Sequence, residues 1–234
     1  MISILIPVYN EQETIQELLR RVEASPFDKE VIIVDDGSDD GTAALLLAST
    51  ARRDRMRIIT HARNRGKGAA IKSALPLVSG DIVVIQDSDL EYDPREYDRI
   101  LKPILDGRAD VVYGSRFVGG REHRVLYFWH YAGNKFLTLL SNMFTNLNLT
   151  DMETGCKAFR TDVLRQLDLE QQRFGFEPEV TAKIARMGCR VYEVGISYSG
   201  RTYQEGKKVS WRDGYHAIWC IVKYGLLRKR RVRH

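Results

Sequence analysis

The chain has 234 residues, of which 44% are hydrophobic, and it carries a formal net charge of +5. This length accommodates one α/β domain with a substantial core plus short appendages. The chain contains no run of about 18 uncharged apolar residues and no signal-peptide pattern, so we expect a protein that is neither secreted nor membrane-spanning. Three widely separated cysteines lack the spacing of metal ligands and are expected to be free thiols, namely Cys156, Cys189 and Cys220.

The first half of the chain alternates short apolar runs with amphipathic helical patterns. This alternation predicts a mostly parallel sheet flanked by helices. We expect strands at residues 2–8, 31–34, 56–60, 81–86 and 111–114, and helices at residues 13–24, 42–53, 68–78 and 95–105. The predicted fold class is therefore α/β, a Rossmann-like nucleotide-binding sheet with its ligand beyond the carboxyl ends of the strands.

The second half has two segments rich in aromatic residues. Residues 126–147 predict a long helix that is too polar to span a bilayer; it either lies in a membrane interface or is an ordinary core helix. Residues 213–227 predict a last amphipathic helix, which leads into a tail whose basicity suits anionic lipid headgroups. No basic motif interleaved with aromatics supports nucleic-acid binding. We expect a catalytic domain at 1–212, with a possible interfacial helix at 125–147, and an amphipathic helix with a basic tail at 213–234.

Two acids follow the strand predicted at 81–86. Asp87 and Asp89, one residue apart at a strand end, can both reach a divalent cation, and hard carboxylate oxygens suit Mg²⁺ or Mn²⁺. Such a cation neutralises the charge of a departing diphosphate. Glu91 is a candidate for a third ligand. The alternative is that these are ordinary loop acids, one of which caps a helix.

Two further loops carry residues suited to a nucleotide. Asp35 and Asp36 end the second predicted strand, where a carboxylate can accept hydrogen bonds from a base or a ribose. Residues 63–68 open a helix, so their glycines permit close backbone approach, their amides point toward an anion, and Lys67 adds a charge suited to phosphate. The spacing differs from that of a P-loop. A plain glycine-rich turn is the alternative.

In their order along the chain, five motifs resemble those of family 2 glycosyltransferases of the GT-A fold, and most of all the dolichyl-phosphate mannose and glucose synthase branch. They are Pro7-Val8-Tyr9-Asn10-Glu11, Val34-Asp35-Asp36-Gly37-Ser38, Asn64-Arg65-Gly66-Lys67-Gly68, Asp87-Ser88-Asp89-Leu90-Glu91 and Gly114-Ser115-Arg116. Two later acidic segments, 151–157 and 174–179, are also similar to the family. The family often has glutamine where Glu91 stands, and many relatives carry C-terminal transmembrane helices that this chain lacks.

The resemblance implies roles for individual residues. The expected nucleotide-sugar site comprises Pro7, Tyr9, Glu11, Asp35, Asp36, Lys67, Asp87 and Ser88. The expected metal ligands are Asp87, Asp89 and Glu91. Cations over the acceptor phosphate are expected to be Arg116, Arg201 and Lys207.

The resemblance also implies a reaction, a metal-dependent inverting transfer of a sugar from a nucleotide-diphosphate donor to a polyprenyl phosphate at the cytoplasmic face of a membrane. A UDP-sugar is preferred over GDP-mannose as donor. We expect Asp89, Asp151 and Arg116 to be catalytic, with Asp151 as base or acceptor-positioning group. Two alternatives stand beside this reading. One is transfer to a glycan or soluble hydroxyl, with Asp151 or Glu153 as base, and the other is a non-catalytic nucleotide- or lipid-binding module.

Overall fold

The computed structural model describes the chain except for residues 51–52, 120–121, 126, 203, 207–210 and 227–234. A seven-stranded sheet runs through its centre in the order β3-β2-β1-β4-β6-β5-β7. Its strands are β1 (Ile2–Val8), β2 (Lys29–Asp35), β3 (Met56–Thr60), β4 (Ile82–Ile85), β5 (Val111–Ser115), β6 (Lys157–Arg160) and β7 (Val191–Gly195). Strand β6 is antiparallel to both of its neighbours, and the other pairings are parallel. This is the mostly parallel α/β sheet that the sequence predicted.

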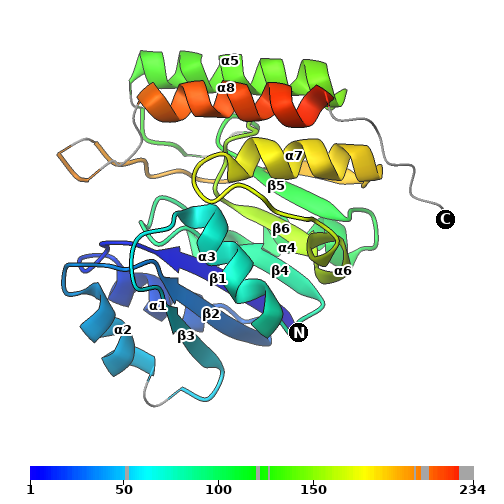
Figure 1. Ribbon diagram of the computed structural model, residues 1–234. Helices are drawn as coiled ribbons and strands as arrows, with labels where there is room; N and C mark the ends of the chain where they lie inside the picture. Colours follow the sequence, from blue (N-terminus) through cyan, green and yellow to red (C-terminus); the bar gives the residue numbers. More distant parts are fainter. Residues whose placement is uncertain (51–52, 120–121, 126, 203, 207–210, 227–234) are drawn as a thin grey trace.

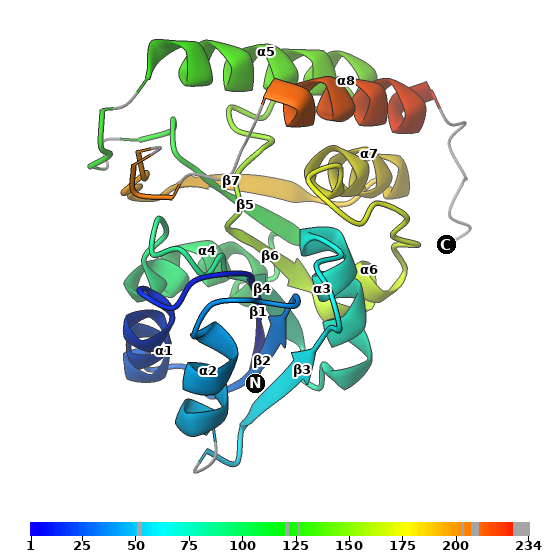
Figure 2. The ribbon, with the colours of Figure 1, turned by 60° about the vertical axis from the view of Figure 1, so that its left-hand side comes forward.

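Helices cover both faces of the sheet, as Figures 1 and 2 show. The described helices are α1 (Ile15–Ala24), α2 (Thr42–Thr50), α3 (Lys67–Ala74), α4 (Tyr97–Leu105), α5 (Phe128–Thr145), α6 (Thr161–Arg165), α7 (Phe176–Met187) and α8 (Trp211–Leu226). One core cluster joins α1, α2 and α4 to the sheet, and a second joins α3, α6 and α7 to its opposite face. Helices α5 and α8 pack on α7 and form an additional layer outside it (Figure 1).

Strand β1 shows how the sequence builds this core. Ile4 and Ile6 pack in the first cluster, while Leu5 between them packs in the second. Alternate side chains of a strand point to opposite faces, so a strand that is apolar throughout is buried on both sides. The same holds for β2, which was predicted from its β-branched run.

The structure differs from the predicted elements at several ends. The helix predicted at 68–78 starts at Lys67 and changes into a 3₁₀ turn at Leu75–Leu77, which contains Pro76. The helix predicted at 95–105 is preceded by a second 3₁₀ turn, Pro94–Glu96, where the Asp93 side chain accepts a hydrogen bond from the amide of Arg95. The helix predicted at 42–53 is described over Thr42–Thr50, and residues 51–52 lie outside the described part of the chain. Strands β6 and β7 and helices α6 and α7 were not predicted.

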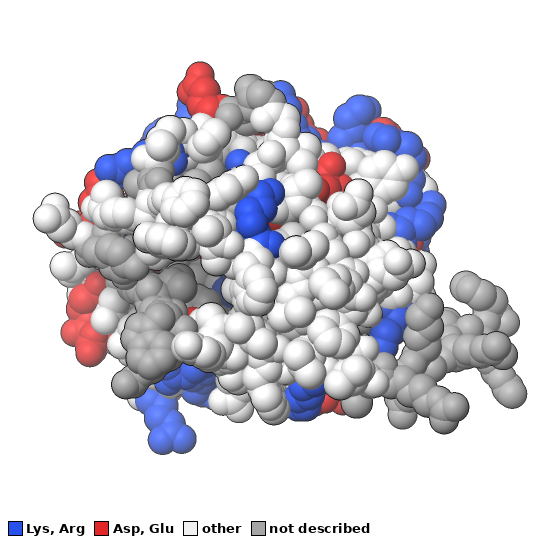
Figure 3. Space-filling view, turned by 90° about the horizontal axis from the view of Figure 1, so that it is seen from above, with Lys and Arg blue, Asp and Glu red and all other residues white. Residues whose placement is uncertain are grey.

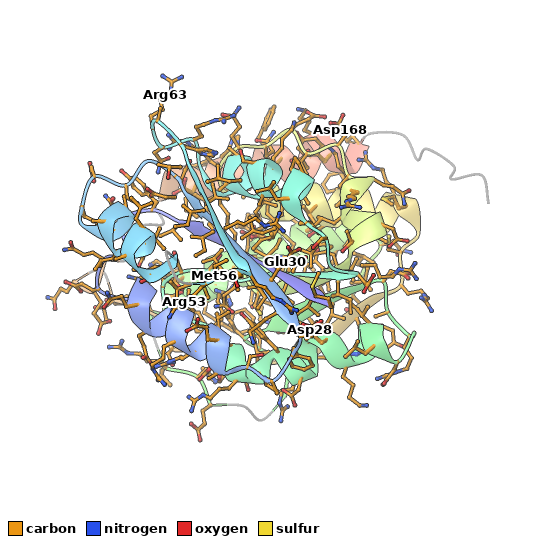
Figure 4. All side chains as sticks on the ribbon, turned by 90° about the horizontal axis from the view of Figure 1, so that it is seen from below. Asp28, Glu30, Arg53, Met56, Arg63 and Asp168 are labelled. Carbon is orange, nitrogen blue, oxygen red and sulfur yellow. The ribbon has the colours of Figure 1, made fainter. Side chains whose placement is uncertain are left out.

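At the amino ends of the strands, Glu30 serves the fold. Its buried carboxylate accepts hydrogen bonds from the hydroxyl of Ser3 at 2.5 Å and from the amides of Ser79 at 2.6 Å and Gly80 at 3.3 Å. Figure 4 shows Glu30 near Asp28 and Met56 on the underside of the molecule. Because this edge lies opposite the motif loops, we assign Glu30 to stability.

None of the helices, as far as their residues are described, is long and apolar enough to cross a membrane.

Candidate active site

The motif loops meet at one edge of the sheet. Strands β2, β1 and β4 are parallel neighbours, with Val8 opposite Asp35 and Leu5 opposite Ile85. The loops that follow these strands therefore start side by side. Pro7 lies on β1, and Tyr9 and Glu11 follow it. Hydrogen bonds join two of these loops through Thr14, whose hydroxyl donates to the carboxylate of Glu11 at 2.7 Å and to the carbonyl of Ser88 at 3.0 Å.

The two acids after β4 each face a cation. Asp87 Oδ1 lies 2.7 Å from Lys67 Nζ, and its Oδ2 packs so closely on Gly155 that a Cβ there would lie 1.8 Å away. Asp89 Oδ2 lies 3.6 Å from the Arg201 guanidinium. These two carboxylates suit a divalent cation that takes its remaining ligands from a diphosphate and water. The positive charges of Lys67 and Arg201 balance the negative charges of these two acids.

Both carboxylate oxygens of Glu91 accept hydrogen bonds from the segment around Arg201. Its Oε2 accepts a hydrogen bond from the Tyr198 hydroxyl at 2.8 Å, and its Oε1 accepts one from the amide of Arg201 at 2.7 Å. Within the described residues, no group of three potential ligands is arranged around a common metal position. Both oxygens of Glu91 thus fix the loop that carries Arg201, and its role as a third ligand stays a prediction.

Arg201 reaches the donor side of the site. Its guanidinium lies 2.7 Å from Glu11 Oε1, in addition to its contact with Asp89. This contact joins the segment after β7 to the loop after β1. The sequence placed Arg201 over an acceptor phosphate, whereas the structure places it between two acids beside the predicted metal position. Lys207, its predicted partner, lies outside the described residues.

The backbone amides of the loop before α3 are bound by a side chain of the protein. The buried carboxylate of Asp36 accepts hydrogen bonds from the amides of Arg65 at 3.0 Å and Gly66 at 2.6 Å, and it contacts His61 Nδ1 at 2.6 Å. The amides predicted to point toward a phosphate therefore point toward Asp36. Asp36 thus anchors this loop. The sequence predicted a nucleotide contact for Asp36 and did not predict this anchoring. His61 was not among the predicted site residues.

The glycines of the same loop serve chain packing. A Cβ on Gly66 would lie 2.5 Å from the carbonyl oxygen of Gln172, and one on Gly68 would lie 2.1 Å from that of Gln171. The amide of Ala69 donates to the Gln172 carbonyl at 3.0 Å. The close backbone approach inferred from these glycines is real, but the partner is the 171–172 segment.

Lys67 belongs to a buried chain of charges that continues to α7. Its ammonium also lies 2.9 Å from Glu177 Oε1, and Lys157 binds the other oxygen of Glu177. Burial alone lowers the pKa of Lys67, but the carboxylates of Asp87 and Glu177 raise it above its ordinary value. Lys67 is therefore a permanent cation. Glu177 was missed as a site residue, although its place in an acidic segment at a helix start was a usable signal.

Arg116 and Asp151 form a second buried unit. Two atoms of the guanidinium lie 2.6 Å from the two oxygens of the Asp151 carboxylate, and the amide of Arg116 also donates to it at 3.1 Å. Glu193 holds the other side of this unit by accepting the amides of Thr150 and Asp151. Three donors from Arg116 contact the Asp151 carboxylate, which therefore positions Arg116; its role as a base stays a prediction.

Glu153 lies near the charges of Glu177, Lys157 and Arg116, but one of its carboxylate oxygens has no hydrogen bond within the described part of the chain. Its Oε1 is buried and has no hydrogen-bond partner among the described residues. Burial, and after it the charge of Glu177, raises the pKa of Glu153 to about 7. Burial, and after it the charges of Asp87 and Glu91, raises the pKa of Asp89 to about 7 as well, so Glu153 is one of two acids of the site suited to exchange a proton near neutral pH.

The fold and the paired acids after β4 define a class, the glycosyltransferases of the GT-A fold. Residues 3–168 match the family model for glycosyl transferase family 2, so the chain belongs to this family and is a glycosyltransferase. An undecaprenyl-phosphate mannosyltransferase of Micrococcus luteus is 31% identical, over 95% of this chain and 93% of that protein. A polyprenol monophosphomannose synthase of Mycolicibacterium smegmatis is 28% identical, over 95% and 86%.

A third relative is longer than this chain. The undecaprenyl-phosphate 4-deoxy-4-formamido-L-arabinose transferase of Pseudomonas aeruginosa is 31% identical over 91% of this chain, which spans 61% of that protein. Among solved structures, glucosyl-3-phosphoglycerate synthase from Mycobacterium tuberculosis, in complex with Mn²⁺, UDP and phosphoglyceric acid, superimposes with a TM-score of 0.75. It is 22% identical, and the match covers 97% of this chain and 79% of that one. This likeness establishes the shared fold.

Proposed function

We propose that this glycosyltransferase moves a sugar from a nucleotide-diphosphate donor to a polyprenyl phosphate with inversion of configuration. The observation that carries the proposal is the pairing of Asp87 and Asp89 with Lys67 and Arg201 at the carboxyl edge of the sheet, with Arg116 bound nearby to Asp151. Such a site combines acids for a metal with cations for phosphate. The relatives named for undecaprenyl-phosphate and polyprenol substrates support the acceptor.

The proposed reaction is a single displacement. An oxygen of the acceptor phosphate attacks the anomeric carbon, and the bond to the diphosphate breaks with its electron pair going to the diphosphate. A phosphate monoester has its second pKa near 6, so it is largely dianionic at neutral pH. This acceptor needs no strong base, which agrees with an Asp151 that is already bound to Arg116.

Residues of the chain take separate parts in this reaction. Asp87 and Asp89 would hold Mg²⁺ or Mn²⁺, which would supply positive charge to neutralise the diphosphate. Glu11 orients Arg201, and Glu177 orients Lys67, so that both cations meet donor phosphates by charge-assisted hydrogen bonds. Pro7, Tyr9, Asp35 and Ser88 are proposed to line the nucleotide pocket. We assign Arg116 to the acceptor phosphate.

We place the reaction at the cytoplasmic surface of a membrane. Five basic residues follow α8 in the sequence, namely Arg228, Lys229, Arg230, Arg231 and Arg233. Each contributes roughly 1 kcal/mol of attraction to an anionic membrane surface. The structure does not describe these residues, so the partner is inferred from their charge.

Transfer to a hydroxyl acceptor is the second candidate function, and Glu153 favours it. A hydroxyl must lose its proton during the attack, and a carboxylate with a pKa of about 7 can accept that proton. In this case Glu153→Gln loses nearly all transfer. If the acceptor is a phosphate, the same variant retains most of it.

The direct test is a transfer assay with a panel of UDP-, GDP- and dTDP-sugars, Mn²⁺, and a short-chain prenyl phosphate beside a prenyl alcohol. The UDP-sugars are the donors to test first. We expect product with the phosphate alone and at least a hundredfold loss in Asp89→Asn, whereas Asp98→Asn on the exposed side of α4 keeps its rate. Full activity of Asp89→Asn excludes the metal role of this acid. Product with the alcohol alone selects the second candidate.

A further inference from the structure

The inward side of helix α5 carries both polar and apolar side chains. Its buried side chains are Thr138 and Ser141. The hydroxyl of Thr138 accepts a hydrogen bond from the amide of Met152 at 3.1 Å, and the Asn142 side chain pairs with both backbone groups of Leu149 at 2.7 and 3.1 Å. These bonds fix the segment that leads into Asp151. On the same side, Leu137 and Leu140 pack partly buried against the second core cluster, so α5 contributes to the core with one side, and its placement in a membrane interface stays a prediction.

Other apolar side chains of α5 point outward. Trp129 is 80% exposed and Met143 is 73% exposed. With 3.6 residues per turn, Tyr131 and Phe144 are exposed on either side of an arc of about 100° around the helix axis, and five further exposed residues fall within that arc. They are Phe128, Trp129, Phe136, Leu139 and Met143.

Helix α8 extends the same surface. Tyr215, Trp219 and Leu226 are exposed at helical spacing, while Cys220 and Tyr224 on the opposite side are buried. A Cβ on Gly225 would lie 2.6 Å from Phe144, so the two helices pack closely where they meet. Figure 3 shows the face over α5 and α8 as broadly uncharged. We call this face the apolar platform, made of Phe128, Trp129, Phe136, Leu139, Met143, Tyr215, Trp219 and Leu226.

The excess of basic residues around the platform indicates which kind of partner binds it. Residues 125–149 contain Lys135 and no acid, and residues 207–234 contain nine basic residues and one acid. A second copy docked on this face by twofold symmetry brings two such basic sets together, which is repulsive. An anionic bilayer attracts them, and Trp, Tyr and basic side chains are the residues that anchor helices in a membrane interface.

We infer that the apolar platform is a bilayer-docking surface, on which α5 and α8 lie in the headgroup region and insert their aromatic and aliphatic side chains. The inference rests on the proposed function in one respect, the delivery of a lipid-borne acceptor. Lys135 on α5 donates to the carbonyl of Thr150 at 3.1 Å, next to Asp151, so the platform adjoins the Arg116 side of the site. A phosphate at the membrane surface thus enters beside α5.

The test is flotation of the full-length protein with vesicles of equal parts phosphatidylcholine and phosphatidylglycerol. Trp129→Ser combined with Met143→Ser removes two exposed side chains whose burial in lipid contributes most, and we expect the partition coefficient to fall about tenfold or more. The matched control is Leu47→Ser combined with Leu105→Ser, which removes exposed leucines from α2 and α4. The control variant should bind vesicles as the unaltered protein does.

Two further measurements separate this inference from the proposed function. Transfer to a short-chain, water-soluble prenyl phosphate should be equal in both double variants, because the altered side chains are distant from the acids. Equal vesicle binding by all proteins overturns the docking surface while transfer still supports the reaction. Light scattering that shows a dimer dissociated by the platform substitutions, with no vesicle binding, also overturns it and assigns the face to a second copy.

Discussion

The acidic residues of the site differ in what their side chains contact. Lys67 and Arg201 contact the acids expected to bind metal, so a cation that binds Asp87 and Asp89 must take over contacts that these side chains make. Asp36 and Asp151 instead organise backbone and a neighbouring arginine. An acid at the end of a strand therefore supports the site in two ways, by binding ligands or by fixing the loops that do.

The Arg116–Asp151 pair predicts a large loss of stability. Asp151→Ala leaves a guanidinium buried without its counter-charge, which typically costs about 3–5 kcal/mol of unfolding free energy. Urea denaturation followed by circular dichroism measures it. The exposed Arg124–Glu205 pair is the control, and Glu205→Ala should leave the urea midpoint nearly unchanged. Equal midpoints for the two variants contradict the anchoring role of Asp151.

Glu153 predicts a dependence of stability on pH. Its pKa is raised from 4.5 to about 7, so between these values the folded protein holds a proton that the unfolded chain has released. The contribution of Glu153 to the free energy of unfolding therefore falls as the pH rises from about 4.5 to 7, by on the order of 3 kcal/mol, and is constant above that range. Glu153→Gln should remove this share of the fall, leave the share of Asp89, whose pKa is also raised to about 7, and be more stable than the unaltered protein at pH 8.

Urea midpoints at pH 5 and pH 8 check the Glu153 prediction. Glu13→Gln, at an exposed position on the first loop, serves as the control and should keep the fall. If Glu153→Gln and the unaltered protein lose stability in parallel across this range, the raised pKa belongs to another group.

At the scale of elements, the site depends on contacts between α3 and the segment before α7. Gly66 and Gly68 bring the start of α3 against the carbonyls of Gln171 and Gln172, and Glu179 on α7 accepts the amides of Glu170 and Gln171. This packing places Lys67 beside Glu177. The glycines thus position a site cation by letting two chain segments touch.

Gly68→Ala tests this contact. The new Cβ would lie 2.1 Å from the Gln171 carbonyl oxygen, so the segments must separate, and we expect a loss of about 2–4 kcal/mol of unfolding free energy together with weaker donor binding. Gly133→Ala on α5 has open space around its Cβ and should raise stability by up to about 1 kcal/mol. Thermal unfolding with and without donor measures both variants. A melting temperature that rises in both denies the close contact.

At the scale of the whole molecule, helix α7 connects the sheet that carries the site to the helices that carry the apolar platform. The sheet fixes the site loops at its carboxyl edge, and α7 carries the layer of α5 and α8 (Figure 1). The basic tail follows α8 directly in the sequence. The molecule therefore combines an apolar surface with charge at its border, which is the combination that binds peripheral proteins to anionic membranes.

Removing residues 227–234 tests the electrostatic share of that binding. Each basic residue near an anionic surface contributes roughly 1 kcal/mol of binding. The loss of five basic residues should therefore weaken binding to phosphatidylglycerol vesicles at low salt by tenfold at least and by several orders of magnitude at most. Donor-induced thermal stabilisation should persist, because it depends on the sheet edge. Added salt should weaken the full chain far more than the shortened one. Identical salt curves refute a role for the tail.

The sequence determined the α/β class, the first five strands and the loops that form the site. Each of these is a local pattern, since continuous β-branched runs such as residues 31–34 mark buried strands and polar residues cluster where such strands end. Strand β6 was missed because it is four residues long and contains the buried Lys157, whose partner Glu177 lies 20 residues away. Helix α7 begins with two buried acids, which no hydrophobic periodicity reveals.

Tertiary structure alone decided the partner of each charge. Asp36, Asp87, Asp89 and Asp151 look alike in the sequence, but the structure gives them backbone amides, Lys67, Arg201 and Arg116 respectively. It also decided that α5 turns its aromatic side outward, because the inward side makes polar contacts with residues 149–152. Local pattern fixes where charged and apolar side chains occur along a chain. Which of them meet depends on chain segments brought together from far apart, and that information is absent from any single window of sequence.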